Sequence, residues 1–347
     1  MKIAAGTASA SARPPATNVL AAIGDTQLVE MTRLLERRDV RAWAKLEALN
    51  PSGSAKSRPA ERMIAEAIRT GRIGPGSTVI ESTSGNLGVA LAQVCGFHGL
   101  KLICVVDSRT TELNIATMRA LGADVRIVTR PDRDSGDLLA ARLKLVARLL
   151  RSVPGSFWPD QYANPSNADA HSAGTMREID EALDGDLDYL FVATSTTGTL
   201  CGCINYLRHM ERRTSVVAVD AVGSALFGGV PGPRRLPGFG AGVETKLSQR
   251  IAPDRLIRVS EIDAVAGCRR LVRREAIFAG ASSGAVVAAL GALAPAMEPG
   301  SRCALIFHDG GTGYLDTVYD DDWVERELGY GPGDVATMTG ESIEPPS

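Results

Sequence analysis

Four short segments of the sequence carry side chains that could do chemistry. Lys56 stands alone in "NPSGSAKSRPA" (residues 50–60), where a helix is about to begin. Three other segments, "ESTSGNLG" (81–88), "TSTTGTLCG" (194–202) and "AGASSGA" (279–285), combine glycine with hydroxyl side chains. A lysine amine can act as a nucleophile or a base, and N–H groups at a helix start bind anions. The set predicts a site that joins a reactive amine to an anion.

Taken singly, three of these segments have an ordinary alternative. A lone lysine is often a surface charge, and the segments 81–88 and 279–285 also fit simple capped helix starts. Segment 194–202 is more specific, because hydroxyl residues and a glycine separate a strand from a helix, as in a phosphate cradle. It is neither a Walker loop nor a G-x-G-x-x-G motif, so a dinucleotide site is poorly supported.

Strands and helices alternate around these segments. Expected strands cover residues 77–83, 101–107, 125–129, 187–194, 215–222 and 302–309, and expected helices cover 88–99, 112–123, 137–152 and 200–212. This alternation is typical of βαβ units with parallel sheets, so we expect an α/β fold. The region 155–171 is the expected hinge between two lobes, and the Gly/Pro-rich coil 223–244 is long enough to suggest a function.

Composition limits the classes of partner. Apolar residues make up 44% of the 347 residues, the net charge is −2, and the longest apolar stretch (285–297) is too short to span a bilayer. We therefore expect neither nucleic acid nor membrane as a partner. Scattered cysteines and no signal peptide predict a cytoplasmic protein, and the four histidines show no metal-ligand spacing. Both ends of the chain are expected to be disordered tails.

The order of the four segments resembles the fold-type II pyridoxal phosphate enzymes, the cysteine synthase/cystathionine β-synthase family. The resemblance covers about residues 17–323. It implies a tryptophan synthase β-subunit-like α/β fold whose two lobes each hold a mainly parallel sheet flanked by helices. The larger, cofactor-binding lobe would comprise 17–49 and 160–327 and the smaller, mobile lobe 50–159, with tails at 1–16 and 328–347. A homodimer is implied by the family alone.

The resemblance also implies roles for individual residues. Lys56 would form the Schiff base with pyridoxal 5′-phosphate and later take the substrate Cα proton, with the cofactor as electron sink. Asn86 would bind the ring 3′-oxygen, and Ser282 would face the pyridine nitrogen. The cofactor phosphate would be held by Ser195, Thr196, Thr197, Gly198 and Thr199. The substrate would be bound by Thr83, Ser84, Gly85, Gln161, Tyr162 and Gly238.

Some positions depart from the cysteine synthase pattern. Leu87 replaces the threonine of S-G-N-T-G, Ser195 and Thr197 replace glycines of G-T-G-G-T, and Tyr162 replaces a phenylalanine. "VDAVGSALFGG", "RRLPGFGAGVE" and "GGTGYLDTVYDDDW" are instead similar to the 2,3-diaminopropionate biosynthesis enzymes of siderophore and peptide-antibiotic pathways. That resemblance implies O-phospho-L-serine and L-glutamate as substrates, with phosphate and N-(1-amino-1-carboxy-2-ethyl)-L-glutamate as products, and a partner dehydrogenase acting next.

Two alternatives remain open from the sequence. The first is a cysteine synthase that uses O-acetylserine or O-phosphoserine with sulfide. The second is a non-catalytic protein of the same fold that regulates or scaffolds a complex. The presence of Lys56, Asn86 and Ser282 together argues against a silent protein, since such a protein has no chemical need for the set. The residues that meet the leaving phosphate are not identified, although Arg234 and Arg235 are candidates.

Overall fold

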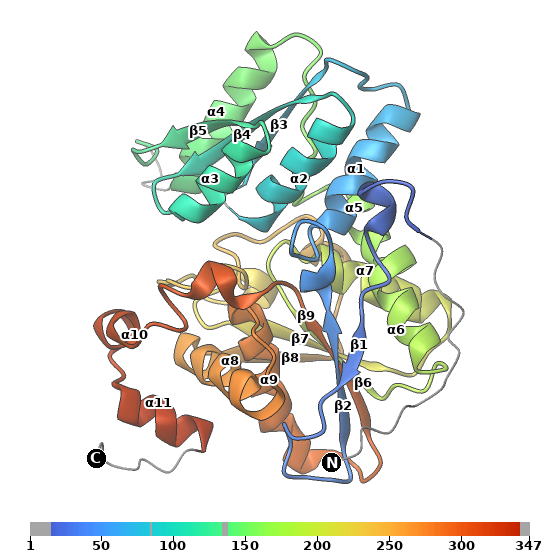
Figure 1. Ribbon diagram of the computed structural model, residues 1–347, viewed down its shortest axis with the longest axis vertical. Helices are drawn as coiled ribbons and strands as arrows, with labels where there is room; N and C mark the ends of the chain where they lie inside the picture. The colour runs from blue at the N-terminus through green and yellow to red at the C-terminus, as the bar shows by residue number, and fades with distance from the viewer. Residues whose placement is uncertain (1–14, 84, 134–137, 341–347) are drawn as a thin grey trace.

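The computed structural model describes residues 15–83, 85–133 and 138–340, and these build two lobes around two sheets (Figure 1). The larger lobe holds a six-stranded sheet in the order β1-β2-β9-β6-β7-β8, in which only β1 runs antiparallel to its neighbour. Its strands are β1 Leu28–Glu30, β2 Arg41–Leu46, β6 Tyr189–Ala193, β7 Ser215–Ala221, β8 Arg255–Val259 and β9 Arg302–Phe307. The α/β fold expected from the sequence is confirmed.

Helices cover both faces of the larger sheet, as buried parallel sheets require. One face packs Phe191, Val217 and Leu305 against α8 (Glu261–Glu275) and α9 (Ala281–Leu293). The opposite face of the sheet packs its buried side chains against α6 (Arg177–Ala182) and α7 (Gly198–His209). Both faces of the sheet are mostly apolar and covered by helices, so a ligand can reach the sheet mainly at its strand ends.

The smaller lobe is built on a parallel three-stranded sheet in the order β3-β4-β5. Ile64, Val79 and Leu91 share the core on the side of α1 and α2, and Val105 packs with Val146 of α4 on the other. The elements of this lobe are α1 Ser57–Arg69, β3 Thr78–Ser82, α2 Asn86–Phe97, β4 Lys101–Asp107, α3 Glu112–Ala120, β5 Asp124–Val128 and α4 Leu138–Ser152.

The chain returns from the smaller to the larger lobe along the segment expected to be a hinge. Phe157 pairs with Val79 in a parallel bridge, so this segment borders the edge of β3 before α5 (Pro165–Ala170) begins. A π-helix (His171–Met176) joins α5 to α6. The crossing segment is thus held by backbone hydrogen bonds, and it delivers residues 161–171 to the boundary between the lobes.

The C-terminal end corrects one expectation. Residues 328–347 were expected to be a disordered tail, but α10 (Asp321–Leu328) is followed by α11 (Pro332–Thr339). Val335 is buried in the core beside α8, and Asp334 Oδ2 accepts a 2.9 Å hydrogen bond from Gly331 N–H at the start of α11. Burial and capping stabilise this short helix despite its Gly/Pro-rich surroundings. Residues 341–347 and 1–14 of the expected tails lie outside the described part of the chain.

Among the described residues, no helix has the length and apolar character needed to cross a membrane.

Candidate active site

The carboxyl ends of three parallel strands meet at the boundary between the lobes. β3 leads into Thr83, β6 into Thr194 and β9 into His308, and helices begin shortly after two of these strands. Ligands of open α/β sheets bind at such strand ends. A cavity of about 570 Å³ lies there.

The cavity collects most of the residues that the sequence singled out. Ten of them line it: Lys56, Thr83, Gly85, Asn86, Gln161, Tyr162, Ser195, Thr196, Gly238 and Ser282. Thr197, Gly198 and Thr199 do not line it but follow directly in the loop and the first turn of α7. Ser84 lies outside the described residues. Residues that are 226 positions apart, Lys56 and Ser282, thus share one cavity.

Lys56 lies at the N-terminal end of α1. A backbone hydrogen bond from Ala55 N–H to His308 O (2.7 Å) fixes the preceding turn against the end of β9. Burial lowers the pKa of the Lys56 amine, while the negative charges of Asp309 and Glu47 oppose that shift. A lowered pKa increases the fraction of neutral amine, which is the form that can act as nucleophile or base.

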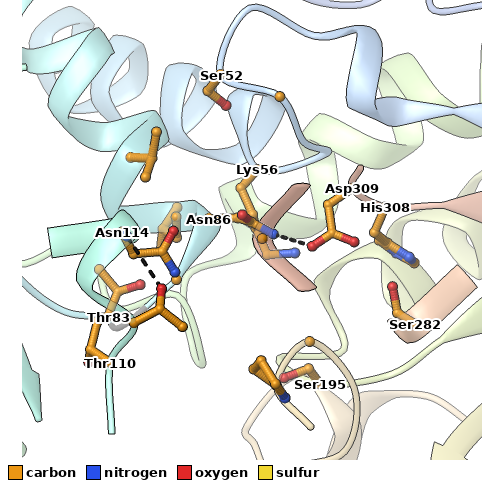
Figure 2. A pocket seen from close by; sticks show the side chains of 18 of the residues that line it. Ser52, Lys56, Thr83, Asn86, Thr110, Asn114, Ser195, Ser282, His308 and Asp309 are labelled. Atoms are coloured by element: carbon orange, nitrogen blue, oxygen red, sulfur yellow. Dashed lines mark hydrogen bonds between the residues drawn. The ribbon is translucent and has the colours of Figure 1, made fainter. Parts of the chain in front are cut away.

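Asp309 is the central residue that the sequence analysis missed. Figure 2 shows Lys56, Asn86 and Asp309 turned toward one another. Asp309 Oδ2 accepts hydrogen bonds from Asn86 Nδ2 (2.7 Å) and from Tyr314 Oη (2.9 Å). Burial raises the pKa of Asp309, and the two hydrogen bonds and the charge of Lys56 lower it. Its place at the end of an expected parallel strand was a signal that could have identified it.

A second missed residue is Arg142, which α4 brings to the cavity. Its side chain is buried and pairs with Asp107 (Nε–Oδ2 3.3 Å). Arg142 is spaced along α4 so that it falls on the same face as the apolar Leu145 and Val146. A buried arginine usually has a charged partner, so this position was the signal in the sequence that could have identified it. Arg109 also lines the cavity, but its side chain is largely exposed and gave no such signal.

The start of α7 lies at one end of the cavity and offers hydrogen-bond donors there. Thr197 caps the helix in a left-handed conformation (φ 66°), and its hydroxyl contacts Thr245 Oγ1 (3.0 Å) rather than the cavity. Gly198 allows close packing, because a Cβ there would lie 2.2 Å from Asn167 Oδ1. The first turn of a helix leaves backbone N–H groups without helical acceptors, and Ser195 and Thr196 add hydroxyls beside them.

The sequence matches the family of pyridoxal-phosphate dependent enzymes over residues 19–309. The chain belongs to this family. The match confirms the resemblance that the four segments predicted. The cofactor of this enzyme is therefore pyridoxal 5′-phosphate.

Relatives and solved structures cover nearly the whole enzyme. The sequence is 44% identical to the N-(2-amino-2-carboxyethyl)-L-glutamate synthase of Ralstonia nicotianae, covering 96% of this chain and 98% of the relative. It is 43% identical to the synthase of the same name in Cupriavidus metallidurans, covering 89% and 91%. The fold is similar to O-ureido-L-serine synthase (TM-score 0.81, 29% identity, 90% and 99% covered). It is also similar to the O-acetylserine dependent cystathionine β-synthase of Helicobacter pylori (0.79, 31%, 87% and 97%).

The residues present fit the cofactor. Lys56 offers an amine, the start of α7 offers donors for a phosphate, and Asn86 and Ser282 offer polar groups between these ends. His308 Nδ1 and Asp309 Oδ1 are buried and have no hydrogen-bond partner within the described residues, so the cavity wall holds polar atoms still to be satisfied. Figure 2 places Ser195 and Ser282 around the same space as Lys56.

Proposed function

We propose that this enzyme catalyses β-replacement on O-phospho-L-serine with L-glutamate as the amine nucleophile. The products would be phosphate and N-(1-amino-1-carboxy-2-ethyl)-L-glutamate. The observation that carries the proposal is the 43–44% identity, over most of the chain, to two synthases named for this type of product. The polar and cationic cavity, with Tyr162, Ser195, Arg109 and Arg142 on its wall, supports it from the structure.

The proposed roles in the cavity follow from charge and position. Both substrates carry more anionic groups than a simple amino acid, and arginine with hydroxyl donors is suited to phosphate and carboxylate oxygens. Burial raises the pKa of the Tyr162 phenol, and the positive charge of Arg142 opposes that shift, so the two side chains interact electrostatically. We assign the leaving phosphate and the carboxylates of glutamate to the part of the cavity wall with Arg109, Arg142 and Tyr162, and the cofactor phosphate to residues 195–199.

The remaining site residues would bind and orient the reacting carbon. The cofactor, when bound, withdraws electrons from the substrate Cα, which makes the Cα proton removable. Lys56 Nζ would hold the cofactor before the substrate arrives and then accept that proton. Thr83, Gly85 and Gln161 would hold the substrate carboxylate; Gln161 is itself fixed by a 3.3 Å hydrogen bond from Nε2 to Ser82 O. Phosphate would leave Cβ, and the glutamate nitrogen would add there.

Ser282 would face the pyridine nitrogen of the cofactor from the first turn of α9. It is buried, and a neutral hydroxyl does not enforce a protonated ring as a carboxylate would. Such a pairing favours elimination over transamination. This role, like that of Asn86 toward the ring oxygen, rests on the match to the family.

The proposal extends to the setting of the reaction. The product holds a secondary amine, so a partner dehydrogenase that oxidises the C–N bond on the glutamate side would release 2,3-diaminopropionate for siderophore or peptide-antibiotic synthesis. We place the enzyme in the cytoplasm as a homodimer, in keeping with its family.

Phosphate release separates this function from its closest rival. Purified enzyme loaded with pyridoxal phosphate would be given O-phospho-L-serine with either L-glutamate or sulfide, and O-acetylserine with each. We expect fast phosphate release that depends on glutamate. Efficient cysteine formation from O-acetylserine and sulfide, with no reaction of glutamate, would instead establish a cysteine synthase. Absence of cofactor absorbance and of turnover would identify a silent member of the fold.

A further inference from the structure

The helical segment 165–176 contacts two hydroxyl groups of residues 195–199, the proposed site of the cofactor phosphate. α5 and the π-helix His171–Met176 pack against α7, and single π turns of this kind are rare and often functional. Asn167 of α5 contacts Thr196 Oγ1 (3.4 Å), and His171 contacts Thr199 Oγ1 (3.2 Å). Both side chains are almost completely buried. Neither has a role in the site described above.

Asn167 shows how such a contact directs a hydroxyl proton. Its Nδ2 donates a 2.8 Å hydrogen bond to Gln161 O, and a carbonyl can only accept, so the orientation of the amide is fixed. The contact to Thr196 Oγ1 is therefore also a donation, and Gly198 N–H donates to the same oxygen (3.4 Å). Because this oxygen already accepts from two donors, the Thr196 proton is left for an anion in the cavity.

The direction of the contact between His171 and Thr199 depends on which ring nitrogen of His171 carries the proton. Its Nδ1 contacts Thr175 Oγ1 at 2.9 Å, and its Nε2 contacts Thr199 Oγ1. Burial and the nearby positive charges of Lys56 and Arg58 keep its pKa well below the ordinary value, so the ring is neutral with one N–H. With the proton on Nδ1, Nε2 would be an acceptor, and the Thr199 hydroxyl would donate its hydrogen bond to the ring instead of to an anion. A proton on Nε2 would leave that proton free.

We propose that His171 is a positioning residue of the cofactor-phosphate site: it carries its proton on Nε2, donates to Thr199 Oγ1, and so directs the Thr199 hydroxyl toward the phosphate. The chain of donors runs from Thr175 Oγ1 to His171 Nδ1, and from His171 Nε2 to Thr199. Thr197 provides the contrast, because its hydroxyl donates to Thr196 O (2.6 Å) and is lost to the anion. The inference rests on the proposed placement of the phosphate at residues 195–199.

Nitrogen-15 NMR of histidine-labelled holoenzyme tests the proton position without a mutation in the measured protein. The chain has four histidines, and the signal missing from a His171→Gln sample identifies the ring. We expect couplings of a neutral ring protonated at Nε2. A ring protonated at Nδ1, or a positively charged ring, would overturn the inference.

Two matched variants test the consequence for cofactor binding. The amide nitrogen of glutamine can replace Nε2, whereas that of asparagine can replace only Nδ1. We expect His171→Gln to bind pyridoxal phosphate within about threefold of the unchanged enzyme and His171→Asn to bind it about tenfold more weakly, as for one misdirected hydrogen bond. Equal losses in two folded variants would overturn the inference.

A third variant separates this inference from the placement on which it rests. Thr199→Val should weaken cofactor binding about as much as His171→Asn. If Thr199→Val binds pyridoxal phosphate as tightly as the unchanged enzyme, the Thr199 hydroxyl does not bind the cofactor phosphate, and the inference about His171 is overturned as well. Weakened binding by Thr199→Val together with equal effects of the two His171 variants would overturn the His171 role alone. None of these readouts depends on which substrate the enzyme uses.

Discussion

The side-chain amide of Asn86 donates a 2.7 Å hydrogen bond to the carboxylate of Asp309, which lies 223 residues later in the sequence. Asn86 begins α2 in the smaller lobe, and Asp309 follows β9 in the larger lobe. The bond therefore joins the two lobes across the cavity, beside Lys56. The carboxylate of Asp309 thus orients the Asn86 amide and also raises the pKa of the Lys56 amine.

Replacing Asp309 should shift the pH dependence of the reaction. The Asp309 charge raises the pKa of the Lys56 amine, so Asp309→Asn should lower that pKa further. Lys56 must be neutral to accept a proton, hence the acidic limb of the kcat profile should move to lower pH. The maximal rate should also fall, by about tenfold, because the charge-assisted hydrogen bond between the lobes becomes a weaker neutral one. Steady-state rates from pH 6 to 10 measure both effects, and an acidic limb that moves upward would contradict the assignment.

Lys56→Ala should remove both the covalent hold on the cofactor and the base. We expect loss of the visible absorbance of the bound cofactor and a fall in turnover of at least about 10³-fold, as for removal of a nucleophile and base in one step. Lys101→Ala is the matched control, since Lys101 is an exposed lysine at the start of β4. A Lys56→Ala enzyme that keeps its spectrum and its rate would show that another amine does the work.

Glu81 should make the stability of the protein depend on pH. This carboxyl is buried in β3, where it accepts hydrogen bonds from Trp158 Nε1 (3.1 Å) and Ser82 N–H (2.8 Å). Burial raises its pKa to about 8, with a smaller contribution from the charge of Asp160, while the hydrogen bonds oppose the shift. In the unfolded chain the group is ionised above its ordinary pKa near 4.5. Folding therefore binds a proton between pH 5 and 8, and stability falls as the pH rises.

The slope of that fall is about 1.4 kcal/mol per pH unit for one proton. The free energy of unfolding, measured with urea at several pH values, should show this slope as a difference between the unchanged enzyme and Glu81→Gln. Glu66→Gln, at an exposed ion pair of α1, should leave the pH dependence unchanged. Parallel curves for the unchanged enzyme and Glu81→Gln would mean that Glu81 is ionised in the folded protein.

Two glycines in helices should respond oppositely to alanine. In Gly198→Ala the new methyl would collide with Asn167, so we expect a loss of about 1–3 kcal/mol in the free energy of unfolding and weaker cofactor binding. Gly291 lies in α9, and a methyl group added there would have no atom within 4 Å outside its own helix turn, so Gly291→Ala should be neutral or stabilise by up to about 1 kcal/mol. Urea unfolding of both variants checks the pair, and equal effects would contradict the packing described at Gly198.

Much of the fold and site followed from local patterns. β4 matches its expected range, and several other strands and helices differ from theirs by one to three residues, because alternating apolar runs and glycine boundaries are local signals. Several elements were not predicted, among them the strands β1, β2 and β8 and the helices α8 and α11. Of these, β1 and α11 are short and depend on tertiary contacts. Ten of the fourteen proposed site residues share the cavity, whereas Asp309 and Arg142 required the three-dimensional placement of β9 and α4.

The origin of the new carbon–nitrogen bond tests the proposed function most directly. Holoenzyme would be incubated with O-phospho-L-serine and L-glutamate labelled with nitrogen-15 at its amine, and the products analysed by mass spectrometry. We expect one phosphate released for each N-(1-amino-1-carboxy-2-ethyl)-L-glutamate formed, with the label in the bridging nitrogen. Phosphate release with only pyruvate and ammonia, or a product without the label, would contradict glutamate as the nucleophile.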